Sequence, residues 1–297
     1  MSIINLYNID GQEITQLVSS SVELERTLQS LIEKHLETLL GVKFLATEYQ
    51  ITGNFSGRID TLGLDAENNC PVIIEYKRTL NQNVMSQGLS YLGWLLDHKA
   101  NFEALCREKL GEDAPHEVDW SSPRVLCIAS DFTRYDENAL QQIGQNIELI
   151  KYRKFGEDFL LFELVNQVSS SITTTRRISH TTVSGHLESA DSDLKELFKD
   201  FESHILSLGD DVQKKTLKHY FAFRRLRNFA CVEIHPRNRQ ILVYVKLNPD
   251  DIDLEEGFTR DVRNIGHYGT GDLEIAINTR KDFEKAKPLL LKSYEST

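Results

Sequence analysis

Three short apolar runs near the start of the chain have the composition of β-strands. Each is rich in β-branched, leucine or aromatic residues and is bounded by a polar turn. The runs are residues 42–51, 57–65 and 71–77. The turn between the second and third runs contains Glu67-Asn68-Asn69, so these two runs are expected to form an antiparallel pair. Pro71 can open the third strand because a missing N–H is tolerated there.

Helical periodicity flanks these strands. Apolar residues recur every three or four positions over 24–40, and Gly41 follows where a helix would end. A second helix is expected over 81–98, and it continues over 101–110. The apolar run 124–130 predicts a further strand, so the predicted order is a helix, three strands, a helix and a strand. The elements predicted after it are a short helix over 135–143 and strands over 147–152 and 159–164.

Changes in polarity divide the chain into four parts. The N-terminal extension, 1–19, alternates weakly and contains Asp10-Gly11, which favours a hairpin turn. The first domain is predicted over 20–167. Residues 168–193 are rich in Ser and Thr, which is typical of a linker. The remainder, 194–297, is predicted to be a small α+β domain, and the whole chain to be of the α/β (α+β) class.

The composition adds three points to this picture. No apolar run approaches the about 20 residues that cross a membrane, and the start lacks a signal-peptide pattern. The four cysteines are widely spaced, so no zinc site or disulfide framework is expected, and a cytoplasmic protein is predicted. The net charge of −11 argues against a protein that coats nucleic acid tightly, but it does not exclude a local binding site.

Charged residues at the ends of two predicted strands carry the candidate chemistry. Asp60 lies in 57–65, and Glu75 and Lys77 close 71–77. Side chains alternate along a strand, so Glu75 and Lys77 are expected on one face. Two neighbouring carboxylates repel unless a cation such as Mg²⁺ or Mn²⁺ lies between them. A metal beside a lysine suits phosphodiester cleavage. The alternative is an isolated aspartate and a surface Glu–Lys ion pair.

The segments GRID and VIIEYK, which contain these residues, resemble the PD-(D/E)XK nuclease superfamily. The resemblance covers about residues 20–165 and implies the restriction-endonuclease-like αβββαβ core. It implies that Asp60 and Glu75 bind Mg²⁺ (or Mn²⁺) and that Lys77 is the catalytic lysine. The carbonyl of Tyr76 is a further candidate ligand to this metal. Ile59 stands where the family usually has a proline.

Two helical positions complete the site that the resemblance implies. Many members carry a glutamate on the first helix, for which Glu25 is the first choice and Glu33 the alternative. RecB-like branches carry Gln-x-x-x-Tyr after the lysine, and Gln87 and Tyr91 fit that spacing on one helix face. Taken without the resemblance, Glu25 is also consistent with a solvated helix residue, and Gln87 with a polar helix edge.

The predicted C-terminal domain combines helices at both ends with a strand pair over 231–235 and 241–247 and a strand over 272–278. Basic residues and aromatics interleave over 214–239, which suits either nucleic-acid binding or a core with outward-pointing cations. His267, in the loop GHYGTG, either contacts a ligand or bonds backbone. This half resembles an uncharacterised domain family that often follows such a nuclease domain and is sometimes labelled "predicted transport protein".

Together these features predict an Mg²⁺-dependent deoxyribonuclease, with an endonuclease favoured over an exonuclease. The partner would be nucleic acid, with DNA expected, and no membrane. Cleavage of two strands by one site per chain makes a homodimer one option. The alternative is a non-cleaving module that binds nucleic acid or protein on a nuclease fold. A third option is that the C-terminal domain binds a small effector and gates the nuclease.

Overall fold

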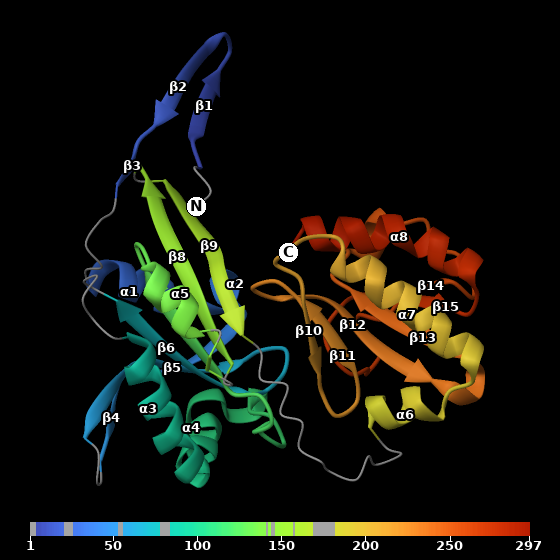
Figure 1. The fold of residues 1–297 in the computed structure, drawn as a ribbon, viewed down its shortest axis with the longest axis horizontal. Helices are drawn as coiled ribbons and strands as arrows, with labels where there is room; N and C mark the ends of the chain where they lie inside the picture. Colours follow the sequence, from blue (N-terminus) through green and yellow to red (C-terminus); the bar gives the residue numbers. More distant parts are fainter. Residues whose placement is uncertain are drawn as a thin grey trace. The chain divides into compact units, whose positions relative to one another are not determined.

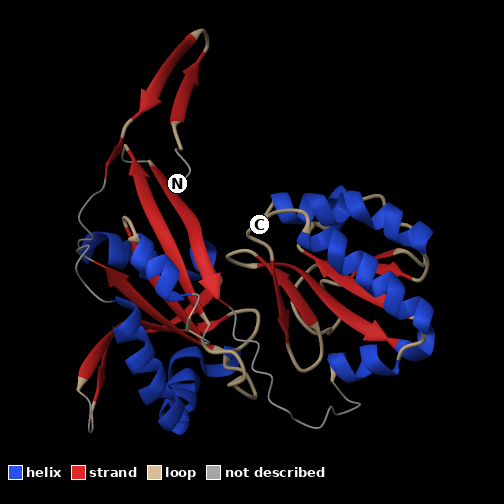
Figure 2. Ribbon diagram, viewed as in Figure 1, coloured by secondary structure: helices blue, strands red, loops and turns tan. Residues whose placement is uncertain are grey.

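The chain divides into two units, Met1–Ser171 and Ile172–Thr297, and each has a β-sheet of its own (Figure 1). The computed structural model describes residues 4–20, 26–52, 56–77, 84–140, 142–143, 146–156, 158–168 and 182–297. Both units combine helices with strands, which confirms the predicted α/β (α+β) class (Figure 2). Within these residues, no helix has both the length and the apolar composition that a membrane crossing needs.

The larger sheet of the first unit has seven strands in the order β3-β8-β7-β6-β5-β4, with β9 paired to β8. Its strands are β3 (Ser19–Ser20), β4 (Val42–Ile51), β5 (Gly57–Asp65), β6 (Pro71–Lys77), β7 (Arg124–Ala129), β8 (Ile147–Phe155) and β9 (Phe159–Val168). The expected antiparallel pairing of β5 with β6 is confirmed, and β6, β7 and β8 run parallel. All residues of β7 are buried, as parallel strands covered on both faces require.

Helices cover both faces of this sheet. They are α1 (Arg26–Lys34), α2 (Leu36–Leu40), α3 (Val84–Asp97), α4 (Lys99–Leu110) and α5 (Arg134–Leu140). The predicted single helix over 24–40 is interrupted at His35, and α2 ends at Gly41 in the left-handed conformation, as expected. Helix α3 packs on β6 and β7. A side chain added at Gly63 would meet Leu36, so α2 lies on the face opposite that of Leu62 and Leu64.

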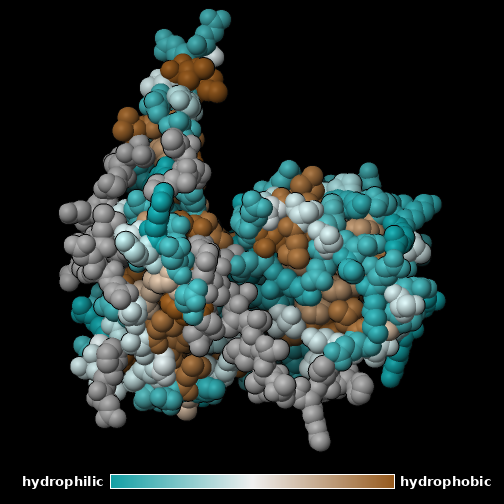
Figure 3. All heavy atoms as spheres, in the orientation of Figure 1, coloured by the Kyte–Doolittle hydropathy of each residue, from teal (hydrophilic) through white to brown (hydrophobic). Residues whose placement is uncertain are grey.

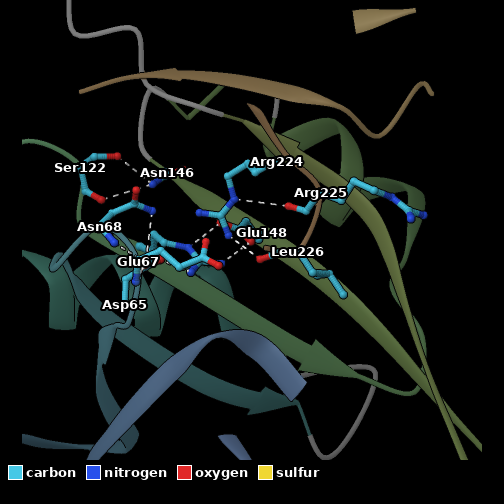
Figure 4. Close-up of polar contacts among 10 residues, drawn as sticks. Asp65, Glu67, Asn68, Ser122, Asn146, Glu148, Arg224, Arg225 and Leu226 are labelled. Atoms are coloured by element: carbon cyan, nitrogen blue, oxygen red, sulfur yellow. Dashed lines mark hydrogen bonds and ion pairs between the residues drawn. The ribbon is translucent and has the colours of Figure 1, made fainter. Parts of the chain in front are cut away.

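A buried ion-pair network joins the end of β5 to the beginnings of β7 and β8 (Figure 4). Arg124 donates from Nε and Nη2 to the two oxygens of Glu148 at 2.8 and 2.9 Å, and from Nη1 to Asp65 at 2.6 Å. Burial disfavours the charged guanidinium, but Glu148 and Asp65 outweigh that effect and raise the pKa of Arg124. Asp65 also accepts the backbone N–H of Asn68, which fixes the turn between β5 and β6.

The N-terminal strands β1 (Leu6–Asp10) and β2 (Glu13–Leu17) form a separate two-stranded antiparallel hairpin. Gly11 has φ +59° in its turn, so the hairpin predicted from Asp10-Gly11 is confirmed. Its side chains are mostly exposed, and they include the apolar residues Tyr7, Ile9 and Ile14 (Figure 3).

The second unit is a six-stranded antiparallel sheet in the order β10-β11-β12-β13-β15-β14. Its strands are β10 (Gln213–Thr216), β11 (Phe221–Arg224), β12 (Asn228–His235), β13 (Gln240–Val245), β14 (Thr259–Asp261) and β15 (Leu273–Ile277). Its helices are α6 (Val183–Ser189), α7 (Ser192–Leu206) and α8 (Arg280–Glu295), which pack with the sheet around one apolar core. The strand pair and the two long helices follow the prediction, whereas β10, β11 and β14 were not expected.

The predicted linker over 168–193 is wrong in its C-terminal part. Helix α6 occupies 183–189, and α7 starts at Ser192. The polar residues that suggested a linker cap these helices, because Thr182 and Asp191 accept backbone N–H groups of the first turn. Val183 and Leu194 are buried in the core of the second unit. Residues 169–181 lie outside the described residues.

Candidate functional site

Asp60 and Glu75 lie side by side on β5 and β6. Thr61 pairs with Ile74, and the same register continued by one residue sets Asp60 opposite Glu75. Each carboxyl group accepts a hydrogen bond from a backbone N–H of the other residue's strand. The N–H of Asp60 donates to Glu75 Oε1 at 3.2 Å, and the N–H of Tyr76 donates to Asp60 Oδ2 at 3.0 Å. The structure therefore brings together the two acidic residues that the sequence selected.

The environment of Glu75 disfavours its charge. The residue is only 2% exposed. Burial, with the nearby charges of Asp60 and then Glu48, raises the pKa of Glu75 to about 9, although the hydrogen bond from Asp60 opposes the shift. At neutral pH the Glu75 carboxyl is therefore protonated unless a cation offsets the repulsion. Such perturbed carboxyl groups are concentrated at functional sites.

The donor set fits a hard divalent cation. Mg²⁺ prefers oxygen ligands and is usually held by one or two carboxylates while it retains several waters. Asp60 and Glu75 supply the two carboxylates, and the carbonyl of Tyr76 is the third oxygen that the sequence suggested. Among the described residues, no three or more His, Cys, Asp or Glu side chains lie close enough together to hold a metal ion. The fit therefore depends on this pair.

Glu48 on β4 is a third acidic residue that sequence reasoning missed. Thr47 pairs with Thr61 and Tyr49 with Ile59, so Glu48 lies opposite Asp60. Glu48, Asp60 and Glu75 thus form one row across three strands. Glu48 has φ +51°, an uncommon conformation for a residue other than glycine, and it forms an ion pair with Arg58. Only the strand register reveals this row, so no local motif could have identified Glu48.

Tyr91 on α3 contacts β5 next to the Asp60–Glu75 pair. Its hydroxyl accepts the N–H of Arg58 at 3.4 Å, and the residue is 6% exposed. Burial, together with the charges of Glu75 and Asp60, raises the pKa of Tyr91. Gly57 permits the contact, because a Cβ there would lie 2.7 Å from Tyr91 Cε1. Gly88 likewise lets α3 approach β7, since a Cβ there would lie 2.5 Å from Val125.

The remaining predicted site residues differ in their placement. Lys77 ends β6, where its backbone pairs with Ala129, but its side chain lies outside the described residues. Glu25 also lies outside them. Gln87 is exposed on α3, so Tyr91 is the member of the Gln-x-x-x-Tyr pair that contacts β5. Glu33 accepts from Thr61 Oγ1 at 2.6 Å, on the face opposite the Glu75 carboxyl, which lies near Gly88 of α3.

The aromatics of the C-terminal basic segment are core residues. Phe221, Phe223 and Phe229 are buried in the core of the second unit, so these three rings are not open to stack on the bases of a nucleic acid. Arg224 is buried and donates to the Leu226 carbonyl at 2.6 Å (Figure 4). His267 lies in contact with the backbone of its own loop through the Tyr268 carbonyl, as the second option for that residue proposed.

Comparisons with known proteins place the chain in a family. Residues 183–297 match a family described as a domain of unknown function (DUF5655), which confirms that the C-terminal half belongs to an uncharacterised domain family. An "Uncharacterized protein" of Haemophilus influenzae (strain ATCC 51907 / DSM 11121 / KW20 / Rd) is 31% identical over 294 residues, covering 94% of this chain and 95% of that protein. No solved structure matches the chain. The chain therefore belongs to the same family as this Haemophilus influenzae protein, and its C-terminal unit is a DUF5655 domain.

Proposed function

We propose that the protein is a divalent-metal-dependent nuclease that hydrolyses phosphodiester bonds, with DNA as its substrate. The observation that carries the proposal is the Asp60–Glu75 pair. Its carboxyl groups lie on neighbouring strands, and each accepts a backbone N–H from the strand of the other. The pKa of Glu75 is about 9. Two neighbouring acids of which one, Glu75, is buried cost stability, so a cation that allows both to ionise is a physical reason for their presence.

The order of elements supports the same proposal. Helices α1 and α2 precede β4, β5 and β6, and α3 and α4 precede β7, which is the αβββαβ order that the resemblance to PD-(D/E)XK nucleases implies. Asp60 and Glu75 lie on the second and third of those strands, and Lys77 ends the third. Agreement between motif residues and their structural context is what a motif hypothesis requires.

The proposed division of roles follows from the chemistry of each group. Asp60, Glu75 and the Tyr76 carbonyl would hold Mg²⁺ or Mn²⁺. The bound cation would polarise a phosphate oxygen and make a water molecule more acidic. Lys77 would bind the phosphate oxygens where negative charge increases during cleavage. Tyr91 would fix the Arg58 backbone, because its hydroxyl accepts the Arg58 N–H.

The test is a cleavage assay with purified full-length protein. Wild type, Glu75→Gln and Lys77→Ala would be incubated with linear, circular, single-stranded and branched DNA and with RNA, each with Mg²⁺ or Mn²⁺. Glu37→Gln, on the exposed surface of α2, is the matched control. Cutting by wild type and the control, with loss of at least about 100-fold in the two site variants, is expected. Cutting that survives both site substitutions would exclude this site, and binding without cutting would favour the non-cleaving module.

A further inference from the structure

A pocket in the second unit is lined by basic and polar side chains. Its volume is about 470 Å³, and it is formed by α6, the end of β12 and the short turn Pro236–Asn238 that follows. Helix α6 packs on both β12 and this turn (Figure 1). The lining residues are His186, Ser189, Ile234, His235, Pro236, Arg237 and Asn238. All of them belong to the second unit, whereas Asp60 and Glu75 belong to the first.

The charge of the pocket favours an anion. The imidazoles of His186 and His235 and the guanidinium of Arg237 line it, and none of its described lining residues is acidic. Because the whole chain carries a net charge of −11, a small anion needs such a local group of basic side chains. Arg237 belongs to the basic segment 214–239, whose phenylalanines are core residues, so this segment can bind an anion without stacking on bases.

Glu233 fixes the ring of His235 at the edge of the pocket. Glu233 Oε2 lies 2.9 Å from His235 Nε2, and Glu233 Oε1 accepts the backbone N–H of Tyr268 at 3.2 Å. The Glu233 side chain is 12% exposed and is not one of the lining groups, whereas that of His235 is 38% exposed. A carboxylate only accepts hydrogen bonds, so Nε2 carries the proton in this contact, and Nδ1 is the ring nitrogen that can meet a ligand.

The basic groups of the pocket match a phosphate monoester better than a carboxylate. A phosphate monoester carries about −1.5 to −2 charges at neutral pH and presents three strong acceptor oxygens. One guanidinium and two imidazolium groups supply a donor for each oxygen, whereas a carboxylate has only two oxygens to accept them. The volume lies in the range of small-molecule sites, about 300–1,000 Å³. Ile234 and Pro236 add apolar surface for the organic part of such a ligand.

We propose that this pocket of the DUF5655 unit binds a phosphate monoester, with Arg237, His186 and His235 as donors to the phosphate group. Asn238 adds an amide donor, whereas the Ser189 hydroxyl already donates to the His186 carbonyl at 2.9 Å. The inference does not depend on the proposed nuclease function, and it gives a location to the option that the C-terminal domain binds a small effector. Phosphate monoesters occur both as free small molecules and at the ends of cleaved nucleic-acid strands, and the experiment separates these two sources.

The test is isothermal titration calorimetry of the full-length protein in a phosphate-free buffer that contains EDTA. EDTA prevents binding or cleavage through a divalent cation at the Asp60–Glu75 pair. The probes are dAMP, ribose 5-phosphate, deoxyadenosine, and one oligonucleotide with and without a 5′-phosphate. The variants are Arg237→Gln, Arg237→Lys and His235→Gln. Lys281→Gln, which removes one positive charge from an exposed position on α8, is the matched control. Melting curves of all variants report folding, and Arg237→Gln should melt like wild type because Arg237 is exposed.

Wild type and the Lys281→Gln control are expected to bind dAMP and ribose 5-phosphate, and not deoxyadenosine, which lacks the phosphate. Arg237→Gln and His235→Gln should each weaken binding about ten- to a hundredfold, because each removes a hydrogen bond to a charged group. Arg237→Lys keeps the charge and should still lose affinity, because lysine lacks the planar pair of donors. Tighter binding of the 5′-phosphorylated oligonucleotide than of dAMP would identify a strand end as the source, and weaker or equal binding a free small molecule.

Three outcomes would overturn the inference. Deoxyadenosine binding as tightly as dAMP would show that the phosphate is not recognised. No binding of dAMP, ribose 5-phosphate or the phosphorylated oligonucleotide at millimolar concentration would exclude the site. Full affinity in both Arg237→Gln and His235→Gln would place the phosphate elsewhere. If His235→Gln lowers the melting temperature, the exposed Arg237 decides, and full affinity in Arg237→Gln then overturns the inference. None of these results depends on cleavage, so the nuclease proposal stands or fails separately.

Discussion

The backbone N–H of Asp60 donates to the Glu75 carboxyl, while the N–H that follows Glu75 donates to the Asp60 carboxyl. Each acid is thereby held against the strand of the other, at a separation that electrostatics opposes. Both the change of stability with pH and the binding of a cation depend on this relationship.

Glu75→Gln is expected to stabilise the metal-free protein at alkaline pH. The pKa of Glu75 is about 9 in the folded protein and near 4.5 when unperturbed. Below pH 4.5 both states carry the proton. Between these values only the folded state keeps it, so the free energy of unfolding falls as pH rises through that window. Glutamine stays neutral, so the variant should gain on the order of 1–3 kcal/mol at pH 8 and lose this pH dependence. Urea unfolding at pH 5 and pH 8 in EDTA measures it, and an equal slope with pH in both proteins would contradict it.

Mg²⁺ or Mn²⁺ is expected to raise the melting temperature of the wild-type first unit. A ligand at about 100 times its Kd stabilises the state that binds it by about 2.7 kcal/mol. Asp60→Asn and Glu75→Gln each remove a charged ligand, so the shift should disappear in both and return to baseline in wild type after EDTA is added. Differential scanning calorimetry with and without metal provides the measurement. A shift of equal size in all three proteins would place the cation elsewhere.

Arg124→Met is expected to destabilise the first unit by about 3–5 kcal/mol, because it leaves Asp65 and Glu148 buried without their cation. Arg124→Lys should also be damaging, since lysine cannot bond both oxygens of Glu148 and reach Asp65 at once. The exposed Arg107→Met is the control and should stay within about 0.5 kcal/mol of wild type. Denaturant titration of the variants tests this, and a small effect of Arg124→Met would mean that water enters the network.

Gly57→Ala is expected to cost about 1–3 kcal/mol, because the new methyl would lie 2.7 Å from the Tyr91 ring. Truncating the ring should relieve that cost, so Gly57→Ala and Tyr91→Ala should be non-additive in a double-mutant cycle. Gly93→Ala is a control on α3, since nothing lies within 4 Å of a Cβ there. Additive effects at Gly57 and Tyr91 would show that the two residues are not in contact in solution.

Gly269→Ala is expected to destabilise the second unit by about 3 kcal/mol. Gly269 has φ +81°, and a Cβ there would lie 2.5 Å from the Cys231 Cβ. The loop also donates the Thr270 N–H to Cys231 Sγ, so it packs closely on β12. Gly266→Ala, with open space around its Cβ, is the matched control. Calorimetry should show a lowered transition for the second unit alone, and similar melting of both variants would contradict the close packing.

The sequence predicted strands that are apolar and bounded by turns, and it did not predict strands made of polar residues. Strand β5 follows its prediction because it is a long apolar run between two glycine- or asparagine-containing turns. Strands β10 (QKKT) and β14 (TRD) carry no such signal, and their pairing with neighbours decides their conformation.

Site residues that lie within one strand or one hairpin could be predicted from the sequence. A site residue that joins them only through the pairing of two strands could not. Asp60 and Glu75 follow from motif and hairpin pairing, whereas Glu48 joins them only because β4 pairs with β5 without a shift at that point. Helical spacing placed Gln87 and Tyr91 on one face, but the close packing of α3 through Gly88 determines which of the two is buried. That contact is tertiary and leaves no periodic signal.

The β5–β6 hairpin also bears on the kinetics of folding. Its turn is short, whereas β6 and β7 are joined by a crossover that contains α3 and α4. Closing a short loop costs less chain entropy than closing a long one, so the hairpin can form before the parallel strands assemble and before Arg124 reaches Asp65. The repulsion between Asp60 and Glu75 then acts in the transition state, before the buried network contributes. Neutralising Glu75 should therefore accelerate refolding more than it slows unfolding, which would make the pair an obstacle on the folding pathway that the protein retains for its function.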